Sequence, residues 1–135
     1  MDMMAGSSGE VVCLIGDGEA NEGTFWESLL LMQKFPETRL SILLDANGSS
    51  ERAIPIIDAI GGKRNCFRTM AFKEVEGHDV EAIKEALEAP EHQKFILCRT
   101  DKGYPCKTLI GNPIWHHRVP NENEYKALVG ELTDA

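Results

Sequence analysis

The sequence has few of the features that mark several large classes of protein. Its 14 basic residues are outnumbered by 22 acidic ones, and the net charge of −8 argues against nucleic acid or an anionic membrane surface as a partner. It has no apolar run long enough to cross a bilayer. Its four cysteines show no CxxC pairing, so we expect a reduced, cytoplasmic setting.

Signals for export and for repetition are also missing. Residues 1–9 are short and polar, unlike a secretory signal, and we expect a disordered or appended start there. The remainder has no internal repeat or low-complexity segment. With 42% apolar and 27% charged residues, the chain of 135 residues suits one globular domain with a modest core, which we place at residues 10–135.

The most informative stretch is a glycine-rich turn near the start of the chain. Five apolar residues, 11–15, run directly into Gly16-Asp17-Gly18, and apolar residues then recur at helical spacing over 24–35. A short apolar run bounded by glycine is typical of a buried parallel strand. The turn therefore joins the carboxyl end of a strand to the amino end of a helix, where open α/β sheets bind ligands and helix N–H groups receive anions.

A second apolar run, 40–44, ends shortly before Asn47 and Ser49. Two consecutive strands joined by one helix would bring their carboxyl ends side by side. Asp17 and Asn47 could then reach one cation, and the backbone carbonyl of Ser49 could add a further oxygen. Because Mg²⁺ favours one or two protein oxygens together with substrate phosphates, the pattern predicts a magnesium site at these three residues.

Three other interpretations of the turn compete with a magnesium site. An EF-hand loop fails because it needs glycine at its sixth position and glutamate at its twelfth, where this chain has Glu22 and Ser28. The late metal motif of haloacid-dehalogenase-type phosphatases is disfavoured, because that family's nucleophile lies on an earlier strand and only ten residues precede Val11. A plain tight turn remains open, although the position of Asn47 argues against it.

The rest of the chain continues the alternation of strands and helices. The sequence predicts strands at 68–75 and 94–100 and helices at 80–89 and 122–132. Asp79 makes a good N-cap for the first of these helices. We interpret His78, just before it, as a turn histidine that bonds to the backbone rather than as a catalytic group.

Together these motifs resemble the thiamine diphosphate motif of the transketolase family. The resemblance extends from about residue 10 to residue 132 and is greatest for the later half of the diphosphate-binding domain, in the N-terminal subunit of a split transketolase. Besides the glycine-rich turn and Asn47, it is carried by Glu22, Trp26, Glu27, Glu76-Gly77-His78-Asp79, Lys102-Gly103 and the segment 112–120.

The resemblance implies an α/β fold, an open parallel sheet with helices on both faces, and thiamine diphosphate and Mg²⁺ as cofactors. The family places a histidine near the diphosphate, and His117 aligns with it. Glu22 corresponds to a family glutamate near the cofactor, so His117 and Glu22 are the candidate catalytic residues. The implied cofactor-binding residues are Gly16, Asp17, Gly18, Glu19, Asn47 and His117.

This chain departs from the family pattern in two places. Arg118 replaces the glycine that commonly follows the aligned histidine, and Tyr104-Pro105-Cys106 stands where a second Lys-Gly is usual. The chain also has nothing that corresponds to the pyrimidine-binding domain, whose glutamate activates the cofactor, or to the upstream part of the diphosphate domain. We therefore expect the chain to be inactive alone.

The resemblance implies transfer of a two-carbon ketol unit, with a sugar phosphate as substrate. The expected partners are a chain that supplies the upstream part of this domain and a pyrimidine-domain subunit. Two alternatives stay open: a pyruvate-dehydrogenase-like or deoxyxylulose-synthase-like enzyme that acts on a 2-oxo acid, and a non-catalytic assembly partner.

Overall fold

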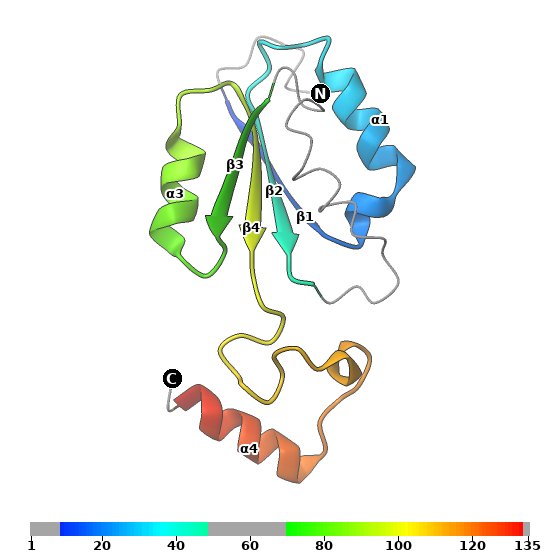
Figure 1. The fold of residues 1–135 in the computed structure, drawn as a ribbon, viewed down its shortest axis with the longest axis vertical. Helices are drawn as coiled ribbons and strands as arrows, with labels where there is room; N and C mark the ends of the chain where they lie inside the picture. The colour runs from blue at the N-terminus through cyan, green and yellow to red at the C-terminus, as the bar shows by residue number, and fades with distance from the viewer. Residues whose placement is uncertain (1–8, 49–69, 134–135) are drawn as a thin grey trace.

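The fold is built on a four-stranded parallel sheet (Figure 1). The computed structural model describes residues 9–48 and 70–133. The strands are β1 (Val11–Gly16), β2 (Leu40–Ala46), β3 (Ala71–Glu76) and β4 (Gln93–Arg99), in the order β1-β2-β4-β3. All neighbouring pairs are parallel, so the predicted open parallel α/β sheet is confirmed.

The two central strands carry the core. β2 and β4 are near-continuous apolar runs, as is typical of strands covered on both faces. Leu44, Phe95 and Ile96 are completely buried. The rings of Phe25 and Phe72 flank that of Phe95, with centroids 6.3 and 5.9 Å away, and extend the core towards the helix and the outer strand.

Helices cover opposite faces of the sheet (Figure 1). α1 (Gly23–Met32) buries Leu29 against the face that carries Leu44 and Leu97. α3 (Val80–Glu88) buries Ala86 against Ile96 and Cys98 on the other face. The α3 N-cap is the predicted Asp79, whose Oδ1 accepts hydrogen bonds from the amides of Glu81 (3.0 Å) and Ala82 (3.1 Å). Such caps typically contribute about 1 kcal/mol.

The last third of the described chain lies beyond the carboxyl ends of the strands (Figure 1). It contains the 3₁₀ helix η4 (Pro113–His116) and the helix α4 (Glu122–Thr133). The loop between β4 and η4 is tied to α4, because the Thr108 amide donates to Glu131 at 3.1 Å and the Thr108 hydroxyl donates to the other oxygen of that carboxylate. These two bonds fix the loop against α4.

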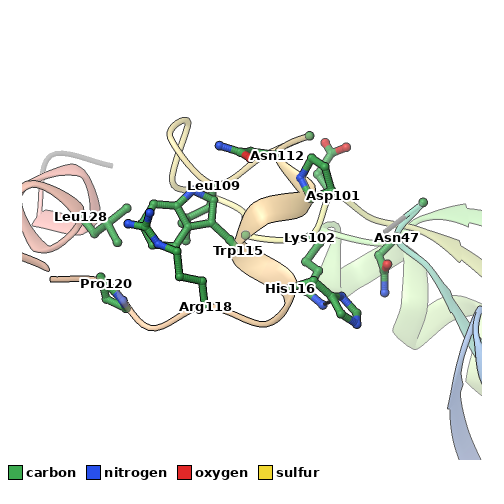
Figure 2. Close-up of a pocket in the computed structure, with 14 residues that line it drawn as sticks. Asn47, Asp101, Lys102, Leu109, Asn112, Trp115, His116, Arg118, Pro120 and Leu128 are labelled. Carbon is green, nitrogen blue, oxygen red and sulfur yellow. Dashed lines mark hydrogen bonds between the residues drawn. The ribbon is translucent and has the colours of Figure 1, made fainter. Parts of the chain in front are cut away.

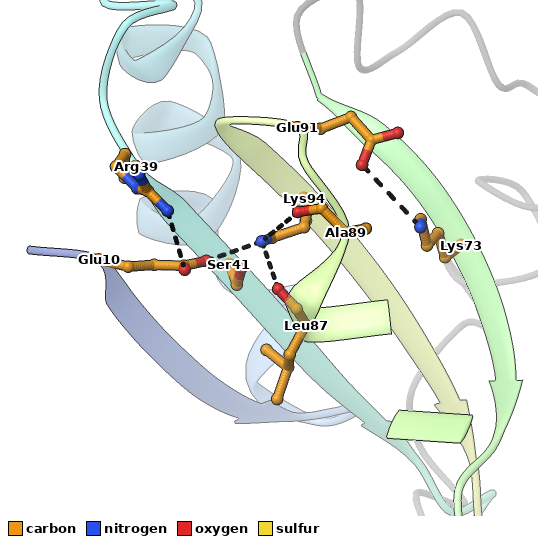
Figure 3. A network of polar contacts seen from close by, with 8 residues as sticks. All are labelled: Glu10, Arg39, Ser41, Lys73, Leu87, Ala89, Glu91 and Lys94. Atoms are coloured by element: carbon orange, nitrogen blue, oxygen red, sulfur yellow. Dashed lines mark hydrogen bonds and ion pairs between the residues drawn. The ribbon is translucent and has the colours of Figure 1, made fainter. Parts of the chain in front are cut away.

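The opposite, amino end of the sheet is closed by a buried ion pair (Figure 3). The side chain of Lys94 is only 2% exposed, and its ammonium lies 2.9 Å from Glu10 Oε1. The same ammonium donates to the carbonyls of Leu87 (2.5 Å) and Ala89 (3.1 Å) at the end of α3. The Ser41 hydroxyl donates to Glu10 at 2.6 Å, so one carboxylate joins the starts of β1, β2 and β4.

β1 differs from the buried strand that its sequence predicts. It lies at the edge of the sheet, and Val12 and Leu14 are 54% and 72% exposed. They point to the face opposite α1, where no element of the described chain covers them. On α1 itself, Leu30 is 66% exposed, although it belongs to the apolar pattern of residues 24–35. Within the described residues, no helix combines the length and the apolar character needed to span a bilayer.

Candidate functional site

The carboxyl ends of β1 and β2 bring the two predicted metal ligands to one edge. The parallel register pairs Gly16 with Asp45, and the Asp17 amide donates to the Asp45 carbonyl at 3.1 Å. The Asp17 carboxylate then accepts a hydrogen bond from the Gly48 amide at 3.0 Å. Asp17 is thus bonded to the residue that follows Asn47, as expected for neighbouring strand ends. Gly48 has a φ of +65°, a conformation that glycine adopts without strain.

The glycine-rich turn is held by its own polar groups. The Gly16 amide donates to the Glu19 carboxylate at 2.7 Å, and the Asn21 side chain donates to the Asp17 carbonyl at 3.0 Å. The short 3₁₀ helix η2 (Glu19–Asn21) follows, and α1 starts at Gly23. Glu19, a predicted cofactor-binding residue, therefore uses its carboxylate to shape the turn.

Asp45, which was not predicted as a site residue, lies at the centre of this edge. Its Oδ2 accepts a hydrogen bond from the Asn47 side-chain nitrogen at 2.8 Å, and its Oδ1 accepts one from the Thr100 hydroxyl. The Asp45 carboxylate also affects a buried thiol. Burial raises the pKa of Cys98, and the negative charge of Asp45 raises it further. The available signal was a carboxylate next to the last residue of the strand, two residues before Asn47.

A cavity of about 840 Å³ opens beside Asn47 and Gly48 (Figure 2). Its volume is in the range of small-molecule and cofactor sites. The other walls come from the loop after β4, from η4 and from α4, as Figure 2 shows. They include Asp101, Lys102, Gly103, Leu109, Gly111, Asn112, Pro113, Trp115, His116, Arg118, Pro120 and Leu128.

The polar wall of the cavity contains a lysine–histidine pair. Lys102 Nζ lies 2.6 Å from His116 Nδ1, and an ammonium can only donate, so Nδ1 is the acceptor. The ring proton of a neutral His116 is then on Nε2, which leaves a donor for an anion. His117 packs edge-on against His116, with ring centroids 4.3 Å apart, and is not among the lining residues. The cofactor role predicted for His117 stays a prediction.

Trp115 and Arg118 form a second part of this wall. The Arg118 guanidinium lies 4.4 Å from the centroid of the Trp115 ring and forms an ion pair with Glu124. The hydrogen bond from Arg118, and next that from the Asn121 amide, hold the pKa of the Glu124 carboxyl below its usual value. Within the described residues, Trp115 Nε1 is the buried side-chain polar atom that has no hydrogen-bond partner.

The turn after β3 supports the cavity from outside. The Asp101 amide donates to His78 Nε2 at 2.8 Å, and the His78 ring stacks on Tyr104 with centroids 3.9 Å apart. The prediction of a turn histidine bonded to the backbone is therefore confirmed. Gly77 packs too closely for any side chain, because a Cβ there would lie 2.3 Å from Thr100 Cγ2 and 2.7 Å from the Arg99 carbonyl oxygen.

One predicted catalytic residue lies away from the cavity, and one predicted metal ligand is outside the described residues. Glu22 is the N-cap residue of α1; it is exposed, its side chain makes no capping hydrogen bond, and it does not line the cavity. Ser49, the third predicted metal ligand, lies outside the described residues. The role expected of each remains a prediction.

The donors present fit a metal that shares its coordination with a phosphate ligand. Within the described residues, no group of three or more His, Cys, Asp or Glu side chains could hold a metal ion. Asp17 and Asn47 offer one carboxylate and one amide, a small set of hard oxygen ligands. Mg²⁺ bound to a diphosphate needs no more than this, since phosphate and water oxygens complete its octahedron.

Similarity to known proteins agrees with this arrangement. No family model matches the chain. It is 29% identical to one of the subunits of apulose-4-phosphate transketolase from Actinobacillus succinogenes over 137 residues, which is 96% of this chain and 49% of that protein. It is 30% identical to human transketolase over 132 residues, 93% of this chain and 21% of that protein.

A further relative is human transketolase-like protein 2, with 31% identity over 125 residues, 86% of this chain and 20% of that protein. The chain therefore spans about half the length of the bacterial relative and about a fifth of the two human proteins. These matches run over almost the whole chain and confirm the expectation from its motifs. The chain belongs to the transketolase family.

Proposed function

We propose that this chain is the magnesium- and diphosphate-binding part of a thiamine diphosphate-dependent, transketolase-like enzyme that transfers a two-carbon ketol unit. The observation that carries the proposal is the 3.0 Å hydrogen bond from the Gly48 amide to Asp17, which joins the two metal-binding segments at the edge of the cavity. The names of the relatives favour a sugar phosphate over a 2-oxo acid as substrate. Residues 10–135 then form the partial cofactor domain.

Each side of the site has a distinct task in this proposal. The Asp17 carboxylate and the Asn47 amide oxygen bind Mg²⁺, together with the Ser49 carbonyl. The glycines on both sides of Asp17 let a diphosphate approach the backbone closely. When bound, thiamine diphosphate supplies the carbanion chemistry, and the protein holds and orients it.

The wall that Lys102 and His116 form, on the Asn47 side of the cavity (Figure 2), suits the anionic part of a ligand. The His116 Nε2–H and the Lys102 ammonium are donors on the same wall, so they can hold diphosphate or sugar-phosphate oxygens. Leu109, Trp115 and Leu128 provide apolar surface that keeps water from the reacting atoms. We keep His117 and Glu22 as residues near the cofactor or near an interface between chains in the assembled enzyme.

The site needs partners to be complete. The proposal assigns the pyrimidine half of the cofactor pocket to another polypeptide, and the upstream part of the domain to that chain or a further one. Support comes from β1, an edge strand whose Val12 and Leu14 side chains are largely exposed. Such an edge pairs readily with another chain unless it is covered. The enzyme is proposed to act in the cytoplasm and to be inactive without these partners.

The test is to purify the chain with its native partners and to measure thiamine diphosphate and Mg²⁺ in the complex. Asp17→Ala should abolish retention of both, because it removes the charged ligand, and Asn47→Ala should reduce it less, because water can replace a neutral oxygen. Glu85→Ala, which removes an exposed carboxylate on α3, is the control and should retain both. A complex that keeps its Mg²⁺ and its activity after Asp17→Ala would refute the proposal.

A further inference from the structure

Asp45 makes contacts that place it behind the metal site rather than in it. Its two carboxylate oxygens are used separately, one by the Thr100 hydroxyl and the other by the Asn47 side-chain nitrogen at 2.8 Å. Its carbonyl accepts the Asp17 amide at 3.1 Å. The residue therefore contacts both proposed metal ligands, Asp17 through its backbone and Asn47 through its side chain.

We infer that Asp45 is a positioning residue that fixes the Asn47 side chain with its oxygen turned towards the metal. The presence of the metal rests on the proposed function. The orientation of the Asn47 amide rests only on its hydrogen bond to Asp45. A carboxylate oxygen can only accept, so the Asn47 group that faces it at 2.8 Å must be the NH₂. A flipped amide would bring two oxygens to that distance, and the resulting repulsion excludes it.

The orientation of the amide follows from this direction of donation. With Nδ2 directed to Asp45, Oδ1 lies on the other side of the planar amide, away from that carboxylate. Asn47 lines the cavity (Figure 2), and the amide of the next residue, Gly48, donates to the Asp17 carboxylate at 3.0 Å. Partners behind a metal ligand commonly orient it in this way, and their loss typically weakens metal affinity by about 10- to 100-fold.

Asp45 also contacts the end of β4, through the carboxylate oxygen that Asn47 does not use. The Thr100 hydroxyl donates to that oxygen, and the Thr100 amide donates to the Ala46 carbonyl at 3.4 Å. The ends of β1, β2 and β4 therefore meet at one residue, β1 through the Asp45 carbonyl and the other two through its carboxylate. Thr100 also offers a matched control, because valine has nearly the same shape and removes the hydroxyl while it leaves the Asp45–Asn47 contact in place.

The experiment compares Asp45→Ala, Asp45→Asn and Thr100→Val with the unaltered full chain by NMR. The first readout is the rate at which the Asn47 side-chain NH₂ exchanges with water, which requires no metal. The second is the apparent Kd for Mn²⁺ in the presence of inorganic pyrophosphate, followed by line broadening at Asp17, Asn47 and Gly48. Asparagine at position 45 retains a carbonyl acceptor but carries no charge, so Asp45→Asn separates the hydrogen bond from simple charge attraction.

Asp45→Ala should speed the Asn47 exchange by about fivefold, as expected for the loss of one hydrogen bond. It should also raise the Mn²⁺ Kd by about 10-fold. Thr100→Val and Asp45→Asn should each remain within about twofold of the unaltered chain in both readouts.

The inference is overturned if Asp45→Ala folds and leaves both readouts unchanged, or if Asp45→Asn loses as much Mn²⁺ affinity as Asp45→Ala, since charge alone would then account for the effect. If Asp45→Ala does not fold, Asp45→Leu replaces it, because leucine is close to aspartate in size and cannot accept a hydrogen bond, and the same two changes are expected of it. Absence of Mn²⁺ broadening in the unaltered chain, with a fivefold change in exchange, would refute the proposed metal site and still establish that Asp45 holds Asn47.

Discussion

The two ends of the sheet each join three strands at an acidic residue, but the carboxylates there have different partners. At the amino end, Glu10 meets the buried ammonium of Lys94, whose remaining protons go to two carbonyls (Figure 3). At the carboxyl end, Asp17 and Asp45 accept hydrogen bonds from neutral groups, and no lysine or arginine of the described chain forms an ion pair with either. The charge of Glu10 is thus paired, whereas the described residues leave Asp17 and Asp45 without an ion-pair partner, as a site for a bound cation requires.

This difference separates structural from functional polar groups within one small domain. A buried charge must be paired, and Lys94 is fully paired, so the amino end contributes to the fold. A carboxylate that has no ion-pair partner and lies beside a cavity can bind a metal or another cation most favourably. Changes at the amino end should therefore alter stability, and changes at the carboxyl end should alter binding.

The largest expected effect on stability is at the amino end. Lys94→Met would leave Glu10 and the carbonyls of Leu87 and Ala89 without their donor, and we expect it to lower the free energy of unfolding by about 3 kcal/mol. Lys84→Met removes an exposed lysine from α3 whose ion pair with Glu81 should contribute less than about 0.5 kcal/mol. Urea denaturation of the full chain compares them, and equal effects would show that burial of Lys94 has no energetic consequence.

The next effect concerns the packing that supports the carboxyl end. Gly77→Ala would place a methyl group 2.3 Å from Thr100 Cγ2, so we expect a loss of about 2 kcal/mol through overpacking. Gly130→Ala in α4 meets no atom within 4 Å and should instead stabilise the chain by about 0.5–1 kcal/mol. Thermal unfolding measures both variants. A neutral Gly77→Ala would contradict the close approach of this turn to β4.

The pH dependence of stability should come partly from Glu10. Hydrogen bonds from Ser41 and Lys94 hold the pKa of the Glu10 carboxyl below its usual value. A carboxyl whose pKa is lower in the folded state stabilises the fold above the unfolded pKa of about 4.3 and loses this contribution as the pH falls below it. Glu10→Gln should therefore flatten the unfolding free energy between about pH 7 and 3. If the slope of unfolding free energy against pH does not change, Glu10 does not contribute to acid unfolding.

The smallest effect on stability is expected at the exposed edge strand. Leu14→Ser replaces a side chain that is 72% exposed, so it should change the unfolding free energy by less than about 0.5 kcal/mol. It should nevertheless reduce recovery of the partner chains severalfold in co-purification. Val80→Ser, at a residue 74% exposed at the start of α3, is the control and should leave recovery intact. Equal recovery with Leu14→Ser would place the partners elsewhere.

The strand ends could be predicted from the sequence because glycine and polar residues interrupt continuous apolar runs. That pattern, with the rule that consecutive parallel strands end at one edge, was enough to bring Asp17 and Asn47 together. The exposure of Val12 and Leu14 could not be predicted in the same way. An apolar strand has the same sequence pattern whether its face is covered or exposed. The exposure of that face depends on where the helices pack.

Other features depended on contacts between distant residues. Lysine is usually exposed, so the sequence around Lys94 gives no sign that it is buried. Its burial depends on contacts with Glu10 and with the end of α3. His116 and His117 are neighbours in one motif, and the backbone at the end of η4, where His117 has φ −126° and ψ 8°, places His116 in the cavity lining. The spacing of residues in the sequence cannot tell which of two neighbouring histidines lines a cavity.

The ion pair between Glu10 and Lys94 also has a consequence for synthesis on the ribosome. Lys94 is made 84 positions after Glu10. Chains are synthesised at about 5–20 residues per second, so roughly 4–17 seconds pass between the synthesis of Glu10 and that of Lys94. For that interval the Glu10 carboxylate at the start of β1 lacks its ammonium partner, and a chaperone or an already finished partner chain has time to reach this edge strand before β4 is made.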